Sequence, residues 1–192
     1  MAGRPKIYDN EVALDKATEV FWKKGYEVAS AEDLLKAMGI GKGSFYLAYK
    51  NGKQELFEKS LQRFFYKYFD QFLKGLKTIE NPVDSIKAFY YQMSDEASGP
   101  HINGCYFSNA IIQVEKQEVK DQAAAIMMKI SNCFSEVLIT AKQKGVLDFK
   151  VPKDILPLYF LNLWSGLNIT RQLEKNPKKI KKLIDEHFKQ IV

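Results

Sequence analysis

Apolar side chains recur at spacings of three and four residues along almost the whole chain, which is the pattern of helices that bury one face. Between Asp9 and Gly25, for example, Ala13, Ala17 and Phe21 fall on one side of a helix. No segment alternates convincingly with the period of two that a half-buried strand needs, and the sequence has no internal repeat. The pattern therefore predicts an all-α fold of about nine helices.

Capping residues and helix breakers give the expected boundaries. Ser30 is a candidate N-cap with Asp33 at the third helical position, and Gly25 and Gly39 are typical of helix ends. Proline is favoured in the first helical turn, and Pro82 is placed there. The expected helices run from Asp9 or Asn10 to Lys24, from Ser30 to Gly39, from Lys42 to about Ala48, from Gly52 through Phe72, from Pro82 to about Ala97, from Cys105 to Gln113, from Glu118 to Lys144, from Pro152 to about Glu174, and from Pro177 to the C-terminus.

Residues 39–44, Gly-Ile-Gly-Lys-Gly-Ser, have the composition of a phosphate-binding loop but not its spacing. A nucleotide loop of the P-loop type requires serine or threonine directly after its Gly-Lys pair, whereas here Gly43 follows Lys42. Ser44 stands where the dinucleotide-binding pattern has its third glycine, and no strand precedes the segment. A helix, a glycine-containing turn and a short second helix instead make up a helix-turn-helix.

The short helix that begins at Lys42 has the properties of a DNA-reading element. It is only about two turns long and could enter the major groove, which is about 12 Å wide. Small residues such as Gly43 let its backbone approach the duplex. Lys42 and Ser44 can donate to base edges or phosphates, and the Tyr46 hydroxyl can reach a phosphate. Lys53, at the start of the next helix, joins free backbone N–H groups in an anion site. The full set of predicted DNA-binding residues, which includes an N-terminal arm, is Arg4, Lys6, Ser30, Lys42, Gly43, Ser44, Tyr46, Tyr49 and Lys53.

Residues 9–56 and their immediate flank contain a specific combination of side chains. They are Ala17, Phe21, Gly25-Tyr26, Ser30-Ala-Glu-Asp-Leu34, Ala37-Met-Gly-Ile-Gly-Lys-Gly-Ser-Phe-Tyr46, Tyr49 and Lys53-Gln-Glu-Leu-Phe57. This combination closely resembles the DNA-binding domain of the tetracycline-repressor (TetR) family of bacterial transcription regulators. The resemblance implies that the recognition helix matches Gly41 to Tyr46 and that Tyr46 and Lys53 contact phosphates. Gly41 is a departure, because the family more often has serine there, and it affects the expected base preference.

The nine-helix pattern also matches the layout of this family, and the resemblance implies a division of the chain. Residues 1–52 would form the helix-turn-helix domain, a helix over 53–75 would connect, and residues 76–192 would bind a ligand and dimerise. The resemblance further implies a homodimer formed through the last two helices, 152–174 and 177–191. Such a dimer would read a pseudo-palindromic double-stranded operator and respond to a small-molecule effector, because two linked readers multiply the specificity of one.

Aromatic residues and methionines are dense in the C-terminal part of the chain. Their ordinary role is a hydrophobic core, although adaptable methionines and flat aromatic walls also suit an apolar ligand pocket. Four lysines at positions 178, 179, 181 and 182 are expected to form a solvated helix face. The residues predicted to line the pocket are Phe65, Phe89, Met93, Cys105, Phe107, Met127 and Trp164.

Two cysteines are too few for a disulfide framework and too isolated for a zinc site. Cys133 falls among apolar residues in mid-helix and is expected in the core. Cys105 follows Gly104 at a helix start, where the helix dipole favours a reactive thiolate. A Gly-Cys pair at the start of helix six recurs in a subgroup of TetR-like regulators, some of which sense electrophiles or oxidants. The resemblance therefore leaves two roles open for Cys105, sensor or inert core residue.

Composition restricts the class of protein without locating a site. The net charge of +6 permits a polyanionic partner, but residues 1–76 hold 13 Lys/Arg against 10 Asp/Glu and the remainder 16 against 13, so each part carries +3. No window reaches the roughly 18 consecutive apolar residues of a membrane span, and the N-terminus lacks the apolar core of a signal peptide. A cytoplasmic protein without membrane association is expected.

Three functional hypotheses remain at this point. The first is a dimeric, ligand-responsive repressor that needs no cofactor or metal. The second is an all-α enzyme or small-molecule carrier without DNA binding, which the sequence disfavours because His101 and His187 lie far apart and no catalytic group of residues stands out. The third, an activator or a regulator without ligand, shares the DNA-binding residues of the first.

Overall fold

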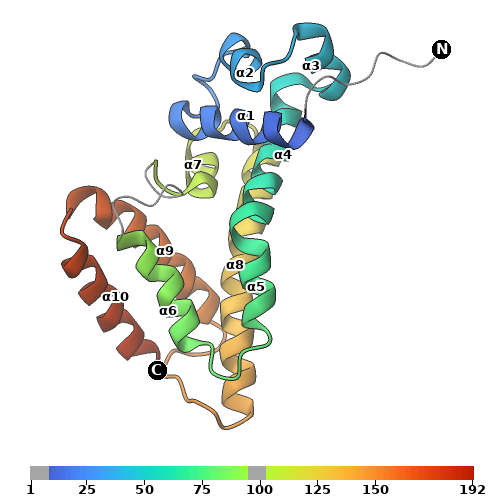
Figure 1. Ribbon diagram of the computed structural model, residues 1–192. Helices are drawn as coiled ribbons and strands as arrows, with labels where there is room; N and C mark the ends of the chain where they lie inside the picture. Colours follow the sequence, from blue (N-terminus) through green and yellow to red (C-terminus); the bar gives the residue numbers. More distant parts are fainter. Residues whose placement is uncertain (1–8, 95–102) are drawn as a thin grey trace.

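The computed structural model describes residues 9–94 and 103–192, and the described residues contain helices and no strands. Two short helices form the head of the molecule together with the first helix, and a long rod connects this head to a helical body (Figure 1). The helices are α1 (Asn10–Lys24), α2 (Ala31–Met38), α3 (Lys42–Ala48), α4 (Gly52–Phe65), η1 (Tyr66–Asp70), α5 (Gln71–Leu76), α6 (Val83–Tyr91), η2 (Gln92–Ser94), α7 (Tyr106–Gln113), α8 (Gln117–Gln143), α9 (Leu156–Leu173) and α10 (Pro177–Ile191).

The predicted all-α fold is confirmed, and its elements number nine in the described residues when continuous helices are joined. In the head, the predicted caps define the helix ends. The Asp9 carboxylate accepts hydrogen bonds from two backbone N–H groups at the start of α1. Ser30 and Asp33 form a reciprocal capping box at the start of α2, and Gly39 ends α2 in the left-handed conformation with φ of 68°.

The structure differs from the predicted helices in two places, and the end of a third predicted helix lies outside the described residues. The helix expected from Pro152 begins only at Leu156, because the preceding residues form a turn in which Pro152 O accepts from Ile155 N. The helix expected to reach Ala97 continues through η2 to Ser94, and the residues after Ser94 up to 102 lie outside the described part. The long connecting rod contains a π-helical turn, η1, that no sequence signal predicted.

One continuous apolar core runs from the head into the body. Helix α1 packs across α2 and α4, while α8 packs against α7, α9 and the rod. By length and composition α8 could cross a membrane, but half of its most apolar window is buried inside the protein, as in core helices of soluble proteins. The short helix α7 lies directly beneath α1, at the junction between head and body (Figure 1).

Candidate nucleic-acid interface

Helix α3 is anchored by the buried Phe45, with Ala48 half-buried beside the core, and its other side chains face solvent. Phe45 is buried in the core of the head, while Lys42, Gly43, Ser44 and Tyr46 are exposed. The exposed side chains are those predicted to read DNA. A cation, a hydroxyl and a phenol on a protruding two-turn helix can donate to base edges and phosphates in a major groove.

The two glycines of this segment are not required by packing within the molecule. A methyl group built at Gly41 or Gly43 meets no atom of the described residues within 4 Å, and neither residue has a positive φ. Internal structure therefore gives no reason for a missing side chain at either position. Close approach of an external partner to the helix backbone does give one.

Three further predicted DNA-binding residues are engaged in the head itself. The Ser30 hydroxyl accepts from Asp33 N as a cap, although the residue is exposed. Tyr49 is only 5 % exposed, so its ring belongs to the core of the head. The Lys53 ammonium donates to Glu27 O at 3.2 Å and lies 4.6 Å from the centre of the Tyr26 ring.

Burial lowers the pKa of Lys53, and a phosphate contact would require this side chain to share or leave its present partners. Arg4 and Lys6, the two residues of the predicted N-terminal arm, lie outside the described residues.

Leu47 is an exposed residue of α3 that sequence reasoning missed. Its side chain is 78 % exposed, more than that of any other large apolar residue described in the head. The neighbouring Tyr46 is 51 % exposed. The sequence could have predicted this exposure, because residues two positions apart lie on nearly opposite sides of a helix. If Phe45 faces the core, Leu47 faces solvent. An apolar group on a reading helix can contact a thymine methyl group.

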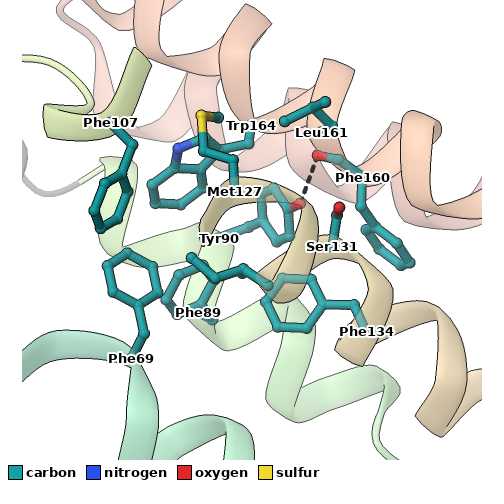
Figure 2. Close-up of a pocket in the computed structure, with 11 residues that line it drawn as sticks. Phe69, Phe89, Tyr90, Phe107, Met127, Ser131, Phe134, Phe160, Leu161 and Trp164 are labelled. Carbon is teal, nitrogen blue, oxygen red and sulfur yellow. Dashed lines mark hydrogen bonds between the residues drawn. The ribbon is translucent and has the colours of Figure 1, made fainter. Parts of the chain in front are cut away.

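The predicted ligand-pocket residues separate into three groups. Phe89, Phe107, Met127 and Trp164 surround a cavity of about 20 Å³, which is room for about one water molecule (Figure 2). The Phe89 and Trp164 rings stack at 5.2 Å, as expected of packed core aromatics.

The remaining predicted residues lie elsewhere. Phe65 and Met93 are buried and line neither this cavity nor the larger one between α7, α8 and α9. Cys105 lines the larger cavity, and Met127 contributes to both.

The larger cavity is an open groove of about 570 Å³ between α7, α8 and α9. Cys105 stands at its edge as the N-cap of α7, and its Sγ accepts a hydrogen bond from Ser108 N at 3.4 Å. Most of the groove walls come from residues that the sequence did not single out. The described residues that line it are Asn103, Gly104, Cys105, Ser108, Asn109, Ile111, Ile112, Met127, Leu161, Ser165, Asn168, Ile169 and Gln172.

Helix α7 is joined to the head at both of its ends. Before its first turn, Gly104 O accepts from Trp22 Nε1 of α1 at 3.0 Å. At its far end, the exposed Gln113 side chain lies beside Gly25, the C-cap of α1, and a methyl group added to Gly25 would come within 3.1 Å of Gln113 Oε1. The same helix supplies one wall of the groove. Helix α7 therefore contacts both the groove and the head.

A second connection between head and rod is ionic. Arg63 of α4 donates from Nε and Nη2 to the Asp15 carboxylate of α1, at 2.8 and 3.2 Å, and from Nη1 to Glu11 at 2.9 Å. Lys67 adds a contact to Asp15 at 3.0 Å. The hydrogen bond from Arg63 is the main reason that the pKa of Asp15 is lowered. This cluster fixes α1 on the rod.

Helix α9 leaves an apolar stripe uncovered. Ile155, Leu158, Ile169 and Leu173 are between 46 % and 83 % exposed, and their positions, with exposed Asn162 and Gly166 between them, follow one side of a helix. The neighbouring α10 instead buries its apolar side and exposes its lysines. Apolar residues scattered singly on a surface are ordinary, but four large ones aligned along one side of a helix form a candidate interaction surface.

Other chemistry is sparse in the described part of the molecule. No group of three or more His, Cys, Asp and Glu side chains there could hold a metal ion. Cys133 is buried in α8 with its Sγ directed at Leu73 O, and burial raises the pKa of its thiol. It has the surroundings expected of a core cysteine.

Comparison with known proteins agrees with this geometry. Residues 13–59 match the family model described as bacterial regulatory proteins, tetR family. The repressor ComR of Escherichia coli K12 is 37 % identical over 89 residues, which are 46 % of this chain and 42 % of ComR. The repressor DhaR of Mycobacterium sp. strain GP1 is 21 % identical over 185 residues, 93 % of this chain and 90 % of DhaR.

Solved structures extend the likeness to the whole fold. A cysteine mutant of the TetR-family regulator CifR, complexed with a 26-base-pair operator duplex, aligns with a TM-score of 0.84 and 21 % identity over 99 % of this chain and all of CifR. The reduced form of E. coli NemR aligns with a TM-score of 0.82 and 18 % identity, over 95 % of this chain and 97 % of NemR. The proteins that this chain resembles are transcriptional regulators, not enzymes.

Proposed function

We propose that this chain, which carries the N-terminal domain of tetR-family regulators on a TetR-like fold, is a sequence-specific DNA-binding repressor that acts as a homodimer in the cytoplasm. The observation that carries the proposal is α3. It exposes Lys42, Ser44 and Tyr46 together and includes a glycine whose missing side chain has no internal explanation. DNA reading accounts for the cation, the hydroxyls and the small residue at once.

Dimerisation is supported by the stripe on α9. Four large apolar side chains at Ile155, Leu158, Ile169 and Leu173 stay exposed in a single subunit, and a second copy of the same face would cover them in an isologous contact. Two heads held at a fixed separation would read the two halves of a pseudo-palindromic operator. In the proposed dimer, the apolar part of this contact would come from α9, with the lysine-bearing α10 at its side.

Regulation by a small molecule is supported by the position of α7. This helix forms a wall of the groove and is joined to α1 through the Trp22–Gly104 hydrogen bond and the Gly25–Gln113 contact. A ligand that favours another position of α7 would favour another position of the heads, and by linkage would weaken operator binding. An activator, or a regulator without a ligand, would use the same α3 surface.

Equilibrium binding to DNA tests the proposal. Fluorescence anisotropy at 150 mM salt compares a duplex from the promoter of the protein's own gene with a scrambled duplex of equal length. The wild type should prefer the promoter at least about 100-fold, and Lys42→Ala should weaken binding about 10- to 100-fold in the dimer. Lys144→Ala removes the same charge at an exposed position at the end of α8 and should leave the affinity unchanged. Equal affinity for both duplexes would refute the proposal.

The Cys105 thiol supports a second, more specific form of regulation. It caps α7, accepts a hydrogen bond from Ser108 N and lines the groove, so an electrophile bound there would meet it. In the proposed reaction with a quinone, a new bond joins Sγ to a ring carbon, and the thiol proton ends on a quinone oxygen. The adduct would displace α7 and release DNA.

Treatment with benzoquinone tests this form of regulation separately. The wild type should lose operator binding and gain the mass of one quinone per subunit at Cys105, while Cys105→Ser should keep binding DNA after the same treatment. Loss of binding in Cys105→Ser equal to that of the wild type would exclude the sensor role and leave the cysteine as a core residue.

A further inference from the structure

The body of the molecule offers two places for a ligand, and their sizes decide between them. The aromatic cavity around Phe89 and Trp164 holds about 20 Å³, so no organic molecule enters it without repacking of the core. The groove of α7, α8 and α9 holds about 570 Å³, within the range of roughly 300 to 1,000 Å³ typical of small-molecule sites. The groove is therefore the candidate ligand site.

The walls of the groove limit the charge of its ligand. Apolar surface comes from both helices, for example from Ile112 of α7 and Leu161 of α9. Among the described residues that line the groove, the polar ones are amides and hydroxyls such as Asn109 and Ser165, and none is ionisable apart from the Cys105 thiol. A charged ligand would lose its hydration without gaining a countercharge there, which is costly.

One wall residue carries an unmet hydrogen-bonding group. Asn168 is only 5 % exposed, and its Nδ2 donates to Trp164 O at 2.9 Å. This bond fixes the orientation of the amide, because a carbonyl oxygen can accept but cannot donate. Asn168 Oδ1 is then left buried without a hydrogen-bond partner among the described residues. Buried acceptors of this kind are rare because the lost hydration costs about 1 to 3 kcal/mol.

We infer that the groove binds an uncharged small molecule with an apolar body and a hydrogen-bond donor, and that Asn168 is the residue that selects the donor. Only the role of this molecule as the effector rests on the proposed function; its binding in the groove does not. Ile169 belongs to both the groove and the exposed stripe of α9, so in the proposed dimer the ligand would sit beside the partner subunit.

Matched pairs of probes isolate the hydrogen bond from the apolar contact. Titration calorimetry on the full-length protein uses 1-naphthol, 1-methoxynaphthalene and 1-naphthoate, together with phenol and anisole as a smaller pair. Each naphthol or phenol should bind about 10-fold more tightly than its methyl ether, since the ether cannot donate to Asn168 Oδ1. Naphthoate should bind more weakly than either naphthalene derivative. Absence of binding by every probe, or equal affinity of alcohol and ether, overturns the inference.

Two variants locate the site. Asn168→Leu should bind the ether at least as well as the wild type does and reduce the alcohol-to-ether preference to about one. Ile112→Glu, at a position 77 % exposed, adds a charge to the groove and should abolish binding of all probes without unfolding the protein. Ile79→Glu makes the same change at an exposed position outside the groove and should bind like the wild type.

The outcomes of these variants separate this inference from the proposed function. Persistence of the alcohol preference in Asn168→Leu, or of binding in Ile112→Glu, overturns the groove assignment even if the protein binds its operator. Conversely, the probe titrations keep their meaning if the protein binds no DNA, because they measure the groove alone. A protein that shows the expected probe preferences but no operator preference would retain this site and lose the proposed function.

Discussion

The candidate site of the head lies on an exposed helix, whereas that of the body lies in a groove beside a packed aromatic core. In the head, Phe45 is buried while most other side chains of α3 lie in solvent, and these exposed residues are the candidates for function. In the body, the conspicuous aromatics such as Phe89 and Trp164 fill a packed core, and the candidate site lies in a groove of ordinary residues beside them. An aromatic side chain such as Tyr46 is therefore a candidate DNA contact in the head, whereas aromatic side chains such as Phe89 and Trp164 only pack together in the body.

Breaking the proposed dimer should produce the largest effect on the head. Leu158→Arg places a charge in the apolar stripe of α9 at a position 51 % exposed in the single subunit, so the subunit should still fold. Burial of this charge in a subunit contact would cost several kcal/mol. The variant should sediment as a monomer and lose about 1,000-fold or more in operator affinity, because one head reads only half of the site.

The control for this variant is Ile79→Arg, an equal change at an exposed position outside the stripe. It should behave as the wild type in sedimentation and in DNA binding. A wild-type protein that is monomeric throughout the micromolar range, or a Leu158→Arg variant that stays dimeric, would contradict the assignment of α9 to the dimer contact.

A smaller effect tests whether Leu47 reads a base. If its exposed side chain packs on a thymine methyl group, replacing that thymine by uracil in the operator removes only the methyl contact. The wild type should lose about 5- to 10-fold in affinity, while Leu47→Ala should bind both duplexes equally. Equal sensitivity of the two proteins to uracil would show that Leu47 has no part in the contact.

The ion pair that fixes α1 on the rod should give the smallest effect. The Arg63 guanidinium hydrogen-bonded to Asp15 lowers the pKa of that carboxyl, so the pair stabilises the folded state above the ordinary carboxyl range near pH 4 and loses this effect as the pH falls through the lowered pKa. Asp15→Asn should destabilise the protein by about 1 kcal/mol at pH 7, discounted for partial exposure of both side chains.

The corresponding measurement is thermal unfolding as a function of pH. The melting temperature of Asp15→Asn should lie about 2 to 4 °C below that of the wild type at pH 7. The difference should close as the pH falls from the ordinary carboxyl range near 4 through the lowered pKa of Asp15. A gap that is constant over this range would mean that the charge of Asp15 contributes nothing to stability.

The sequence predicted the head well because its signals are local. Asp9, Ser30 and Gly39 act on backbone groups within four residues of themselves, and the start of α3 at Lys42 follows from the turn before it. The same reasoning placed α9 too early, because Pro152 is compatible with either a turn or a first helical residue, and the choice depends on packing.

The site in the body could not be predicted in the same way. Asn109 and Asn168 lie 59 positions apart in the sequence and meet in one groove only through the packing of α7 and α9 on α8. Composition favoured the aromatic residues as pocket walls, but it carries no information on whether two rings stack or stand apart. Cys105 was found because a helix start is a local signal, whereas the unmet acceptor of Asn168 is a property of the folded structure.

Helix α7 is proposed to couple the head to the groove, and hydrogen exchange tests this coupling without a ligand. Addition of the promoter duplex should slow amide exchange in α2 and α3 and also change it in α7, residues Tyr106–Gln113, because α7 is joined to α1 at both ends. Trp22→Phe, which removes the hydrogen bond to Gly104, should retain the change in α3 and reduce the change in α7. Exchange that changes only in the head of the wild type, with α7 unaffected, would contradict the claim.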